Sequence, residues 1–197
     1  MLGIKDLIYR YRHNRGYGVQ SPYAFHFVMS VVNEKHAYYA YPLINSAARK
    51  GGYNAARARM LFRIANYVRP QNILMYEPCD AVVCALSAAR PSLLASVLSV
   101  ADGSCGNINS AFRAGQTFGL LYVAEGDECA SLVEQAIACA SRESVIIVDG
   151  IHRSRKMGNL WQSVKQNSSV AVTFDLYSMG ILFFDKKYKK QHYTLKK

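Results

Sequence analysis

The last quarter of the chain carries the feature that most constrains its fold. Two apolar, β-rich runs, VAVTFDLY at 170–177 and GILFFDK at 180–186, are separated by only Ser178 and Met179. A parallel pair of strands needs a crossover of about a dozen residues, so these two strands must be antiparallel neighbours. Any sheet built by this chain therefore contains an antiparallel hairpin at its C-terminal end.

The middle of the chain predicts that the rest of the sheet is parallel. Strand-like runs occur at 73–77, 93–100, 118–124 and 144–149. Segments 128–142 and 154–167 repeat apolar residues at helical spacing, which predicts amphipathic helices between strands. Strands that are apolar on both faces and alternate with helices are typical of a parallel sheet covered on both sides. We therefore expect an α/β, Rossmann-like domain over residues 71–197, with a short last strand over 191–195.

The first 70 residues are expected to form a helical, strand-free N-terminal extension. Ser21 is a good N-cap and Pro22 suits the first position of a helix. A Tyr-rich stretch over 36–52 follows, in which Pro42 and Gly51-Gly52 act as breakers, so it is predicted to be a loop.

A second helix is predicted between Asn54 as its N-cap and Pro70 at its end. Its buried face is expected to carry Leu61, Ile64, Ala65 and Val68. Three arginines in the same segment are expected to point largely outward: Arg57, Arg59 and Arg63.

Composition excludes several classes of protein. With 51% hydrophobic and 19% charged residues, the chain resembles a globular protein rather than a disordered one. Its longest apolar run, 81–100, is interrupted by Arg90-Pro91, so no transmembrane segment is expected. The N-terminus lacks the apolar core of a secretory signal, which favours a cytoplasmic location. Five cysteines without metal-ligand spacing predict buried, reduced thiols and no zinc or other metal site.

The formal charge of +11 is unevenly distributed. Residues 1–70 contain 11 Lys/Arg and 2 Asp/Glu, residues 71–150 contain 3 and 9, and residues 151–197 contain 10 and 2. The centre is therefore acidic and both ends are basic, which favours a peripheral basic surface over a basic active cleft. The C-terminal KKYKKQHYTLKK could be a solvated end, or it could contact nucleic acid or acidic lipid.

Two segments carry a resemblance to a known family. RHNRGYGVQSPYAFHFV at 12–28 resembles an RHGxGVHSPF-type segment, and VDGIHRSRKMGNLWQSVKQNSSVAVTFDLYSMGILFFDKK at 148–187 resembles a DDIHWS…DLFxxGIVFF-type segment. Both are similar to class I S-adenosylmethionine (SAM)-dependent methyltransferase-like proteins of Bacteroidetes. In that fold the last strand runs antiparallel to the others, as the hairpin requires here. The resemblance implies SAM as the cofactor and an unknown methyl acceptor.

The SAM-binding turn expected from this resemblance lies in NILMYEPCDAVVCALSAARP at 72–91. The family's acid in the first strand falls on Met75, its first loop glycine on Glu77 and its second on Ala81. Glycine there lets the backbone turn sharply and approach the cofactor closely, which a side chain obstructs. A carboxylate at Glu77 would also repel the carboxylate of SAM. The sequence therefore predicts a degenerate SAM loop.

Among the other positions implied by the resemblance, some keep the residue type of the family and others do not. Asp102 stands about where the ribose-binding acid would be, although ADGS is also an ordinary turn sequence. The third-strand region, 103–117, is shortened, and Ala124 replaces an acid after the next strand. Asp149 and His152 persist, as a general base or substrate-positioning pair, or as a turn cap and a packed histidine.

The segment before the first helix is a candidate anion-binding site. Arg12, His13 and Arg15 lie just before the helix N-terminus capped by Ser21, where an anion would meet positive charge. An N-terminal arm that packs aromatic residues and leaves these side chains exposed is an equal alternative.

Three functions follow from these residues. The first is a non-catalytic methyltransferase relative with weakened or lost SAM binding, acting as a binding or assembly module, and the sequence slightly favours it. The second is an active SAM-dependent methyltransferase that acts on a small molecule. The third is a basic nucleic-acid-binding protein.

Overall fold

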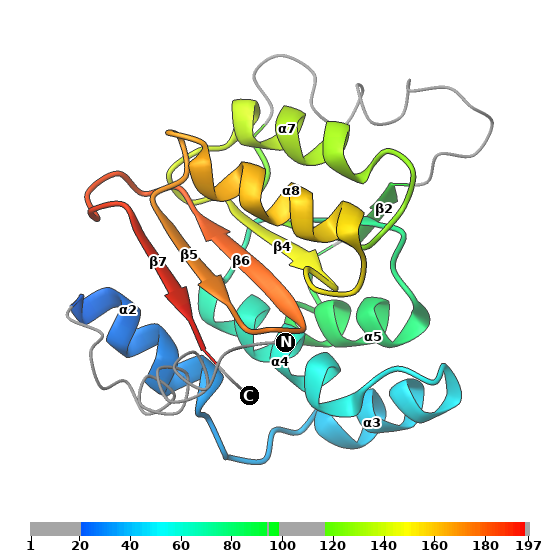
Figure 1. The fold of residues 1–197 in the computed structure, drawn as a ribbon. Helices are drawn as coiled ribbons and strands as arrows, with labels where there is room; N and C mark the ends of the chain where they lie inside the picture. The colour runs from blue at the N-terminus through cyan, green and yellow to red at the C-terminus, as the bar shows by residue number, and fades with distance from the viewer. Residues whose placement is uncertain (1–20, 94, 99–116, 196–197) are drawn as a thin grey trace, which may run out of the picture.

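The computed structural model describes residues 21–93, 95–98 and 117–195. They form one seven-stranded sheet with helices on both faces (Figure 1). The strands are β1 (Ile73–Tyr76), β2 (Ala95–Leu98), β3 (Leu120–Val123), β4 (Val145–Asp149), β5 (Val172–Asp175), β6 (Met179–Phe183) and β7 (Gln191–Thr194). The helices are α2 (Pro22–Phe27), the π-helix η1 (Val28–Val32), α3 (Tyr41–Lys50), α4 (Ala55–Val68), α5 (Asp80–Ala89), α7 (Cys129–Cys139) and α8 (Arg155–Gln166).

The sheet has the strand order β2-β1-β3-β4-β6-β5-β7. Strands β2, β1, β3 and β4 are mutually parallel, whereas β6 is antiparallel to both β4 and β5. The predicted hairpin is therefore confirmed, with Val172 opposite Phe183 and Asp175 opposite Gly180. The α/β, Rossmann-like fold predicted from the sequence is confirmed with it.

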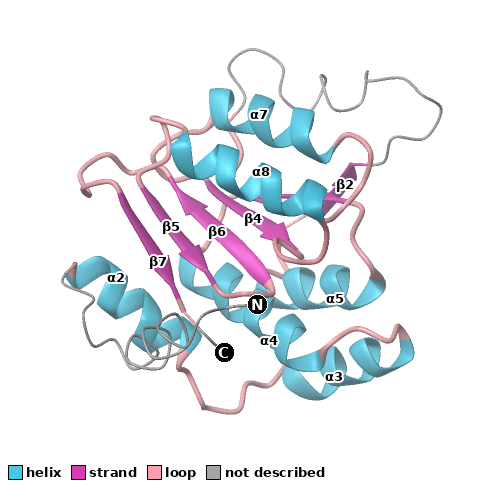
Figure 2. Ribbon diagram, in the orientation of Figure 1, coloured by secondary structure: helices cyan, strands magenta, loops and turns pink. Residues whose placement is uncertain are grey.

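Alternate strand residues supply the cores of the two faces. In β1, Met75 packs on the face that carries α2, η1, α3, α4 and α5, and Tyr76 packs on the face that carries α7 and α8. Figure 2 shows α7 and α8 on one face of the sheet and α4 and α5 on the other. Every residue of β3 is buried, as expected for a central strand that is covered on both sides. Apolar residues at successive strand positions thus place helices on both faces.

Helix α8 packs closely on the antiparallel hairpin. Its buried residues are the predicted stripe of Met157, Leu160, Trp161 and Val164. The Trp161 ring lies so close to Gly180 that a Cβ there would be 2.4 Å from a ring carbon. Only glycine leaves room for this contact between the helix and β6.

The N-caps predicted in the helical region are confirmed. Ser21 Oγ accepts a hydrogen bond from the Ala24 amide, and Asn54 Oδ1 accepts one from the Arg57 amide. The predicted loop over 36–52 is wrong, because its second half forms α3. Pro42 occupies the first turn of that helix, where proline is compatible, and Ile44 and Ala48 bury one face of it.

The orientation predicted for the arginines of α4 is also wrong in part. Arg63 is buried, with Nε donating to the Val31 carbonyl at 2.7 Å and a terminal nitrogen donating to Tyr41 Oη at 3.0 Å. Arg57 is turned toward the end of β4. Both guanidinium groups satisfy acceptors that lie far away in sequence, which helical periodicity does not reveal.

Smaller predictions have mixed outcomes within the described residues. Four cysteines are free thiols, but the prediction that they are buried holds only for Cys129, since Cys84 and Cys139 are half-buried and Cys79 is exposed. None of the described helices is long and apolar enough to cross a membrane. No group of three or more potential metal ligands occurs in the described part of the chain.

Candidate functional site

The carboxyl edge of the parallel strands is where sheets of this architecture bind ligands, at the point where the strand order reverses. Here that point lies between β1 and β3, since the chain passes from β1 through α5 to β2 on one side and resumes at β3 on the other. The turns after β1, β3 and β4 surround this edge. Each of them carries residues singled out by the sequence.

The turn after β1 holds a residue in a conformation that favours glycine. Glu77 has φ of 51°, in the left-handed region, and its side chain is exposed. A non-glycine residue loses roughly 1–2 kcal/mol in this conformation because its Cβ crowds the backbone. The structure thus places Glu77 where a turn of this shape calls for glycine.

Two other predicted cofactor-site positions are fully buried. Met75 lies inside β1 and Ala81 lies in the first turn of α5, and neither side chain is exposed. Met75 belongs to the apolar core on the α4 side of the sheet. A methionine there offers no carboxylate to a ligand.

The N-terminus of α5 is flanked by negative charge. Cys79 is its N-cap but makes no capping hydrogen bond, and Asp80 stands in the first turn. The partial positive charge of a helix N-terminus ordinarily attracts an anion. With Asp80 in the first turn and Glu77 three residues earlier, an incoming carboxylate meets two like charges instead.

The turn after β3 is fastened to α8. Lys156 Nζ donates to the Gly126 carbonyl at 2.7 Å, and Ser154 Oγ donates to Glu125 Oε1 at 2.5 Å. On the inner side, the Glu128 amide donates to Tyr76 Oη at 3.2 Å. The polar groups of this turn are therefore engaged with the protein itself.

At the end of β4, the Asp149 carboxylate is buried in a cluster of donors. The Arg57 guanidinium forms an ion pair with Oδ1. Tyr122 Oη donates to Oδ2 at 3.0 Å, and Tyr53 Oη lies 3.4 Å from the same oxygen. Arg57 also donates to the Ser178 carbonyl at 3.2 Å, which connects α4 to the β5–β6 hairpin. We call these four side chains, Tyr53, Arg57, Tyr122 and Asp149, the Asp149 cluster.

Burial dominates the protonation of the two phenols. Burial, together with the neighbouring Tyr53 and the Asp149 carboxylate, raises the pKa of Tyr122 well above its usual range. Burial and then Asp149 raise the pKa of Tyr53 in the same way. Burial lowers the pKa of Arg57, but Tyr53 and Asp149 outweigh it and leave that pKa raised. Near neutral pH both phenols are therefore protonated donors and Arg57 is a cation.

This arrangement limits what Asp149 can do. Only 4% of the residue is exposed, and its oxygens already accept from three side chains. A ligand at Asp149 would have to compete with Arg57 and two tyrosines for a carboxylate that is almost completely buried. Sequence reasoning found Asp149 but missed Arg57, Tyr53 and Tyr122, since no local pattern joins them. The one available signal was Tyr122, whose hydroxyl needs a hydrogen-bond partner inside the buried strand β3.

His152 belongs to a second, more open group. Gly150, at φ of 66°, turns the chain after β4 and leads to His152, whose Nε2 lies 2.9 Å from Asp175 Oδ2. The Trp161 Nε1 also donates to Asp175 Oδ2, at 3.3 Å. The His152 ring stacks on Tyr177, with the ring centroids 5.3 Å apart. Asp149 and His152, paired in the sequence prediction, therefore have separate partners.

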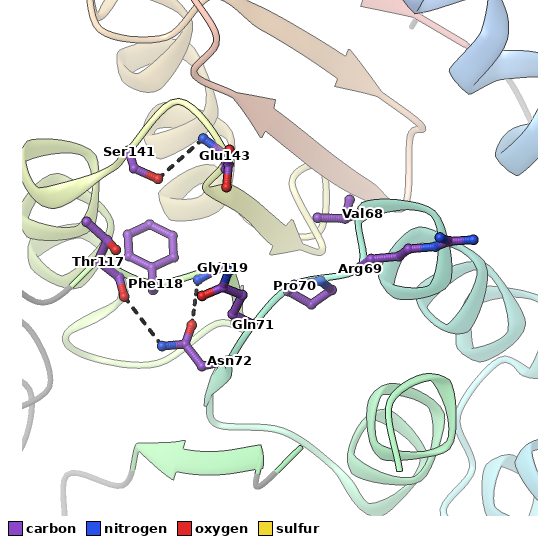
Figure 3. Close-up of a pocket in the computed structure, with 10 residues that line it drawn as sticks. All are labelled: Val68, Arg69, Pro70, Gln71, Asn72, Thr117, Phe118, Gly119, Ser141 and Glu143. Carbon is purple, nitrogen blue, oxygen red and sulfur yellow. Dashed lines mark hydrogen bonds between the residues drawn. The ribbon is translucent and has the colours of Figure 1, made fainter. Parts of the chain in front are cut away.

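A cavity of about 200 Å³ lies at the opposite, amino edge of the sheet (Figure 3). Asn72 bridges its floor, because the Gly119 amide donates to Oδ1 at 2.5 Å while Nδ2 donates to the Thr117 carbonyl at 3.4 Å. These bonds hold together the segments that enter β1 and β3. We interpret this cavity as a by-product of that bracing.

Several predicted site residues cannot be placed. Arg12, His13, Arg15 and Asp102 lie outside the described residues, as does nearly all of the third-strand region 103–117.

Comparison with known proteins gives the fold and no closer relative. No protein-family model matches the sequence, and no curated protein matches it. Solved methyltransferase structures do match. An SAH-bound (S-adenosylhomocysteine-bound) methyltransferase from Podospora anserina has a TM-score of 0.54 at 11% identity, covering 84% of this chain and 96% of that one.

Two further structures support the same fold. A candidate caffeoyl-CoA O-methyltransferase from Staphylococcus aureus has a TM-score of 0.51 at 11% identity, covering 91% of this chain and 98% of that one. The methyltransferase MycE of the mycinamycin biosynthetic pathway, in complex with Mg and SAH, has a TM-score of 0.53 at 6% identity, covering 99% of this chain and 60% of that one. The chain therefore has the Rossmann-like fold of SAM-dependent methyltransferases, which by itself does not establish an activity.

Proposed function

We propose that this chain is a methyltransferase-fold protein whose SAM site is weakened or lost, and that it acts as a binding or assembly module. The observation that carries the proposal is Glu77, a charged residue in a left-handed turn directly after β1. Evolution of an active site would favour glycine there, because glycine adopts this conformation without strain and leaves space for a ligand. The residues present do not fit SAM at this turn.

Charge adds to the steric argument. The carboxylate of SAM would approach the N-terminus of α5, where Glu77 and Asp80 both carry negative charge. Two unit charges about 4 Å apart repel by about 4 kcal/mol at the effective dielectric of a protein surface. A repulsion of even half that size weakens binding by more than a factor of ten.

The Asp149 cluster supports the same conclusion from the other side of the edge. A methyltransferase base must be free to accept a proton from the methyl acceptor, and Asp149 is closed in by Arg57, Tyr53 and Tyr122. Arg57 also leaves no place for a cation beside that carboxylate. The cluster therefore acts as a brace between α4, β3 and β4.

An active methyltransferase remains the second candidate, and His152 is the observation that favours it. Its side chain is partly exposed at the carboxyl edge, and Asp175 fixes its Nε2. Such a pairing leaves Nδ1 available to accept a proton from an acceptor hydroxyl. In this reading a small-molecule acceptor would bind above β4 and β5.

Ligand binding separates the two candidates. A ligand at about 100 times its Kd stabilises a protein by about 2.7 kcal/mol, which shifts Tm by several degrees. We expect neither SAM nor SAH at millimolar concentration to shift Tm, and calorimetry to show no heat of binding. Micromolar binding of SAH to the unaltered protein would overturn the proposal.

A loop variant tests the stated cause. Glu77→Gly combined with Asp80→Asn removes the strained side chain and both charges, whereas Glu134→Gln removes an exposed charge on α7 as a control. We expect the double variant to gain measurable SAH binding and the control to gain none. If the double variant also fails to bind SAH, the loop is not the cause of the loss.

A further inference from the structure

Strand β7 is an open edge of the sheet. It pairs only with β5 among the described strands. The Gln191 amide donates to the Ala171 carbonyl at 3.0 Å, and the Leu195 amide donates to the Asp175 carbonyl at 2.7 Å. Because residues of a parallel strand alternate in the edge to which their backbone groups point, the amides and carbonyls of His192 and Thr194 face away from the sheet.

Positive charge gathers where this edge begins. Lys189 and Lys190 are exposed and lead directly into β7. Lys190 Nζ donates to the last carbonyls of α8, Gln166 at 3.2 Å and Asn167 at 2.8 Å, so the end of α8 lies beside the start of the strand. That helix end brings Lys165 into the same region.

The His192 side chain lies within the influence of the same lysines. Burial, and after it the charges of Lys190 and Lys165, lower the pKa of the His192 imidazole. His192 Nδ1 is hydrogen-bonded to Thr173 Oγ1 at 2.8 Å. The acid two residues further along β5, Asp175, is paired with His152. The nearest acid of the preceding turn, Asp185, is paired with Lys187 at 2.9 Å.

We propose that the edge of β7 binds an extended, acidic polypeptide segment, which adds to the sheet as a further strand. The amide and carbonyl groups of His192 and Thr194, which have no strand partner among the described residues, would supply the backbone hydrogen bonds. Lys189, Lys190 and Lys165 would attract the carboxylates. A second copy of this chain is disfavoured because its own lysines would face these. Lysines on an edge strand commonly prevent it from pairing with a second copy in this way. An acidic partner is attracted by the same lysines and can therefore pair.

This surface is separate from the altered cofactor turn. Strand β7 ends the sheet on one side and β2 ends it on the other (Figure 1). Strand β1 lies next to β2, with β3, β4, β6 and β5 between it and β7. The proposal rests on the binding role proposed above and names the class of partner, an acidic peptide. The weakened SAM site and the peptide-binding edge can nevertheless fail separately. SAH binding tests the turn after β1, and peptide binding tests the edge of β7.

The experiment uses the full chain and a fluorescein-labelled octapeptide of alternating Glu and Val, followed by fluorescence anisotropy. A Lys-Val octapeptide controls for charge. A Glu-Pro octapeptide keeps the negative charge but loses the backbone N–H of every second residue, and each proline fixes φ at about −65°, which disfavours pairing as a strand. We expect saturable binding of the Glu-Val peptide, with each control binding at least about tenfold more weakly, the loss expected when strand hydrogen bonds or charge complementarity are removed.

Two variants locate the site. Thr194→Pro removes an outward-facing amide at an edge where proline is tolerated, and should weaken binding by about tenfold. Lys189→Glu reverses an exposed charge and should weaken binding by about threefold, with the smaller effect of a surface charge. Lys50→Glu makes the same charge change at the end of α3, away from β7, and should leave Kd unchanged. Thermal melts confirm that each variant is folded, and Lys189→Glu carries the test if Thr194→Pro does not fold.

Two results would overturn the proposal. Equal binding of the Glu-Val and Glu-Pro peptides would mean that charge alone attracts them, without strand addition. Binding of a single-stranded oligonucleotide in preference to the peptide, with a steep dependence on salt and no effect of Thr194→Pro, would assign the basic surface to nucleic acid instead.

Discussion

At the carboxyl edge of the sheet, Glu77 follows β1 and Asp149 ends β4. Glu77 is exposed, strained in a left-handed conformation and close to a second acid, Asp80. Asp149 is buried, paired with Arg57 and hydrogen-bonded by Tyr122. The two carboxylates stand at equivalent ends of parallel strands, yet one lies in an exposed turn and the other holds helices and strands together.

Under the proposed function, this difference would let a ligand-binding edge lose its ligand without losing its fold. A turn that faces solvent tolerates a charged side chain at a cost of about 1–2 kcal/mol in backbone strain. A carboxylate at a buried strand end has no such freedom, because an unpaired buried charge destabilises a protein by several kcal/mol. It persists only with partners, and here Arg57, Tyr53 and Tyr122 are those partners.

The largest expected effect comes from removing the cation of the Asp149 cluster. Arg57→Met leaves Asp149 buried without its ion-pair partner, so we expect the free energy of unfolding to fall by about 3–5 kcal/mol. Urea denaturation measures it. The double variant Arg57→Met with Asp149→Asn should recover most of the loss, because no charge is then left unpaired. A loss below 1 kcal/mol (about the value of an exposed pair) would show that the cluster is not a brace.

The second prediction concerns alkaline pH. The pKa values of Tyr122 and Tyr53 are raised in the folded protein, so the folded protein keeps these protons to a higher pH than the unfolded chain does. Their contribution to stability is therefore fully present below the unfolded pKa of about 10 and is lost as the pH rises above it. Each phenol can remove up to about 1.4 kcal/mol per pH unit.

Urea denaturation between neutral pH and the alkaline range measures this slope. Tyr122→Phe is the informative variant, because it removes one buried phenol. It should reduce the decrease in the free energy of unfolding per pH unit. A matched change at the exposed Tyr39, Tyr39→Phe, should leave the slope as it is. Identical slopes in all three proteins would contradict the burial-driven protonation of Tyr122.

The third prediction has the opposite sign. Glu77→Gly should stabilise the protein by about 1 kcal/mol, since relief of left-handed strain exceeds the extra chain entropy of glycine in the unfolded state. Glu77→Ala keeps the Cβ and should give little or none of this gain. Thermal melts of both variants give the comparison. Equal stability of the two would mean that strain at Glu77 is negligible and that only its charge matters.

The smallest expected effect is at His152. His152→Gln removes a partly exposed partner of Asp175, which keeps hydrogen bonds from Trp161 Nε1 and the Tyr177 amide. We expect a loss of about 0.5 kcal/mol or less in the free energy of unfolding. A loss of several kcal/mol, comparable with that of Arg57→Met, would place His152 in the structural framework of the edge. It would then be a poor candidate for a proton acceptor.

The sequence alone determined the fold because its signals are local. The two-residue link at Ser178-Met179 requires an antiparallel hairpin, and apolar runs separated by amphipathic helices require a sheet covered on both faces. The sequence likewise predicted two N-caps, Ser21 and Asn54, and the buried face of α8. Caps and helical faces depend on residues within a few positions of each other. Pro42 was misread because proline is compatible with a first helical turn as well as with a loop.

Tertiary structure alone decided the burial and the partners of those candidate site residues that the structure describes. Arg57 and Asp149 are 92 residues apart in sequence, and Tyr122 and Asp149 are 27 apart, so no local pattern joins them. The left-handed conformation of Glu77 and the outward-facing backbone groups of His192 and Thr194 also depend on how the strands are placed. Spacing along a chain predicts elements, but the charge, burial and partners of a side chain are set by what the fold brings next to it.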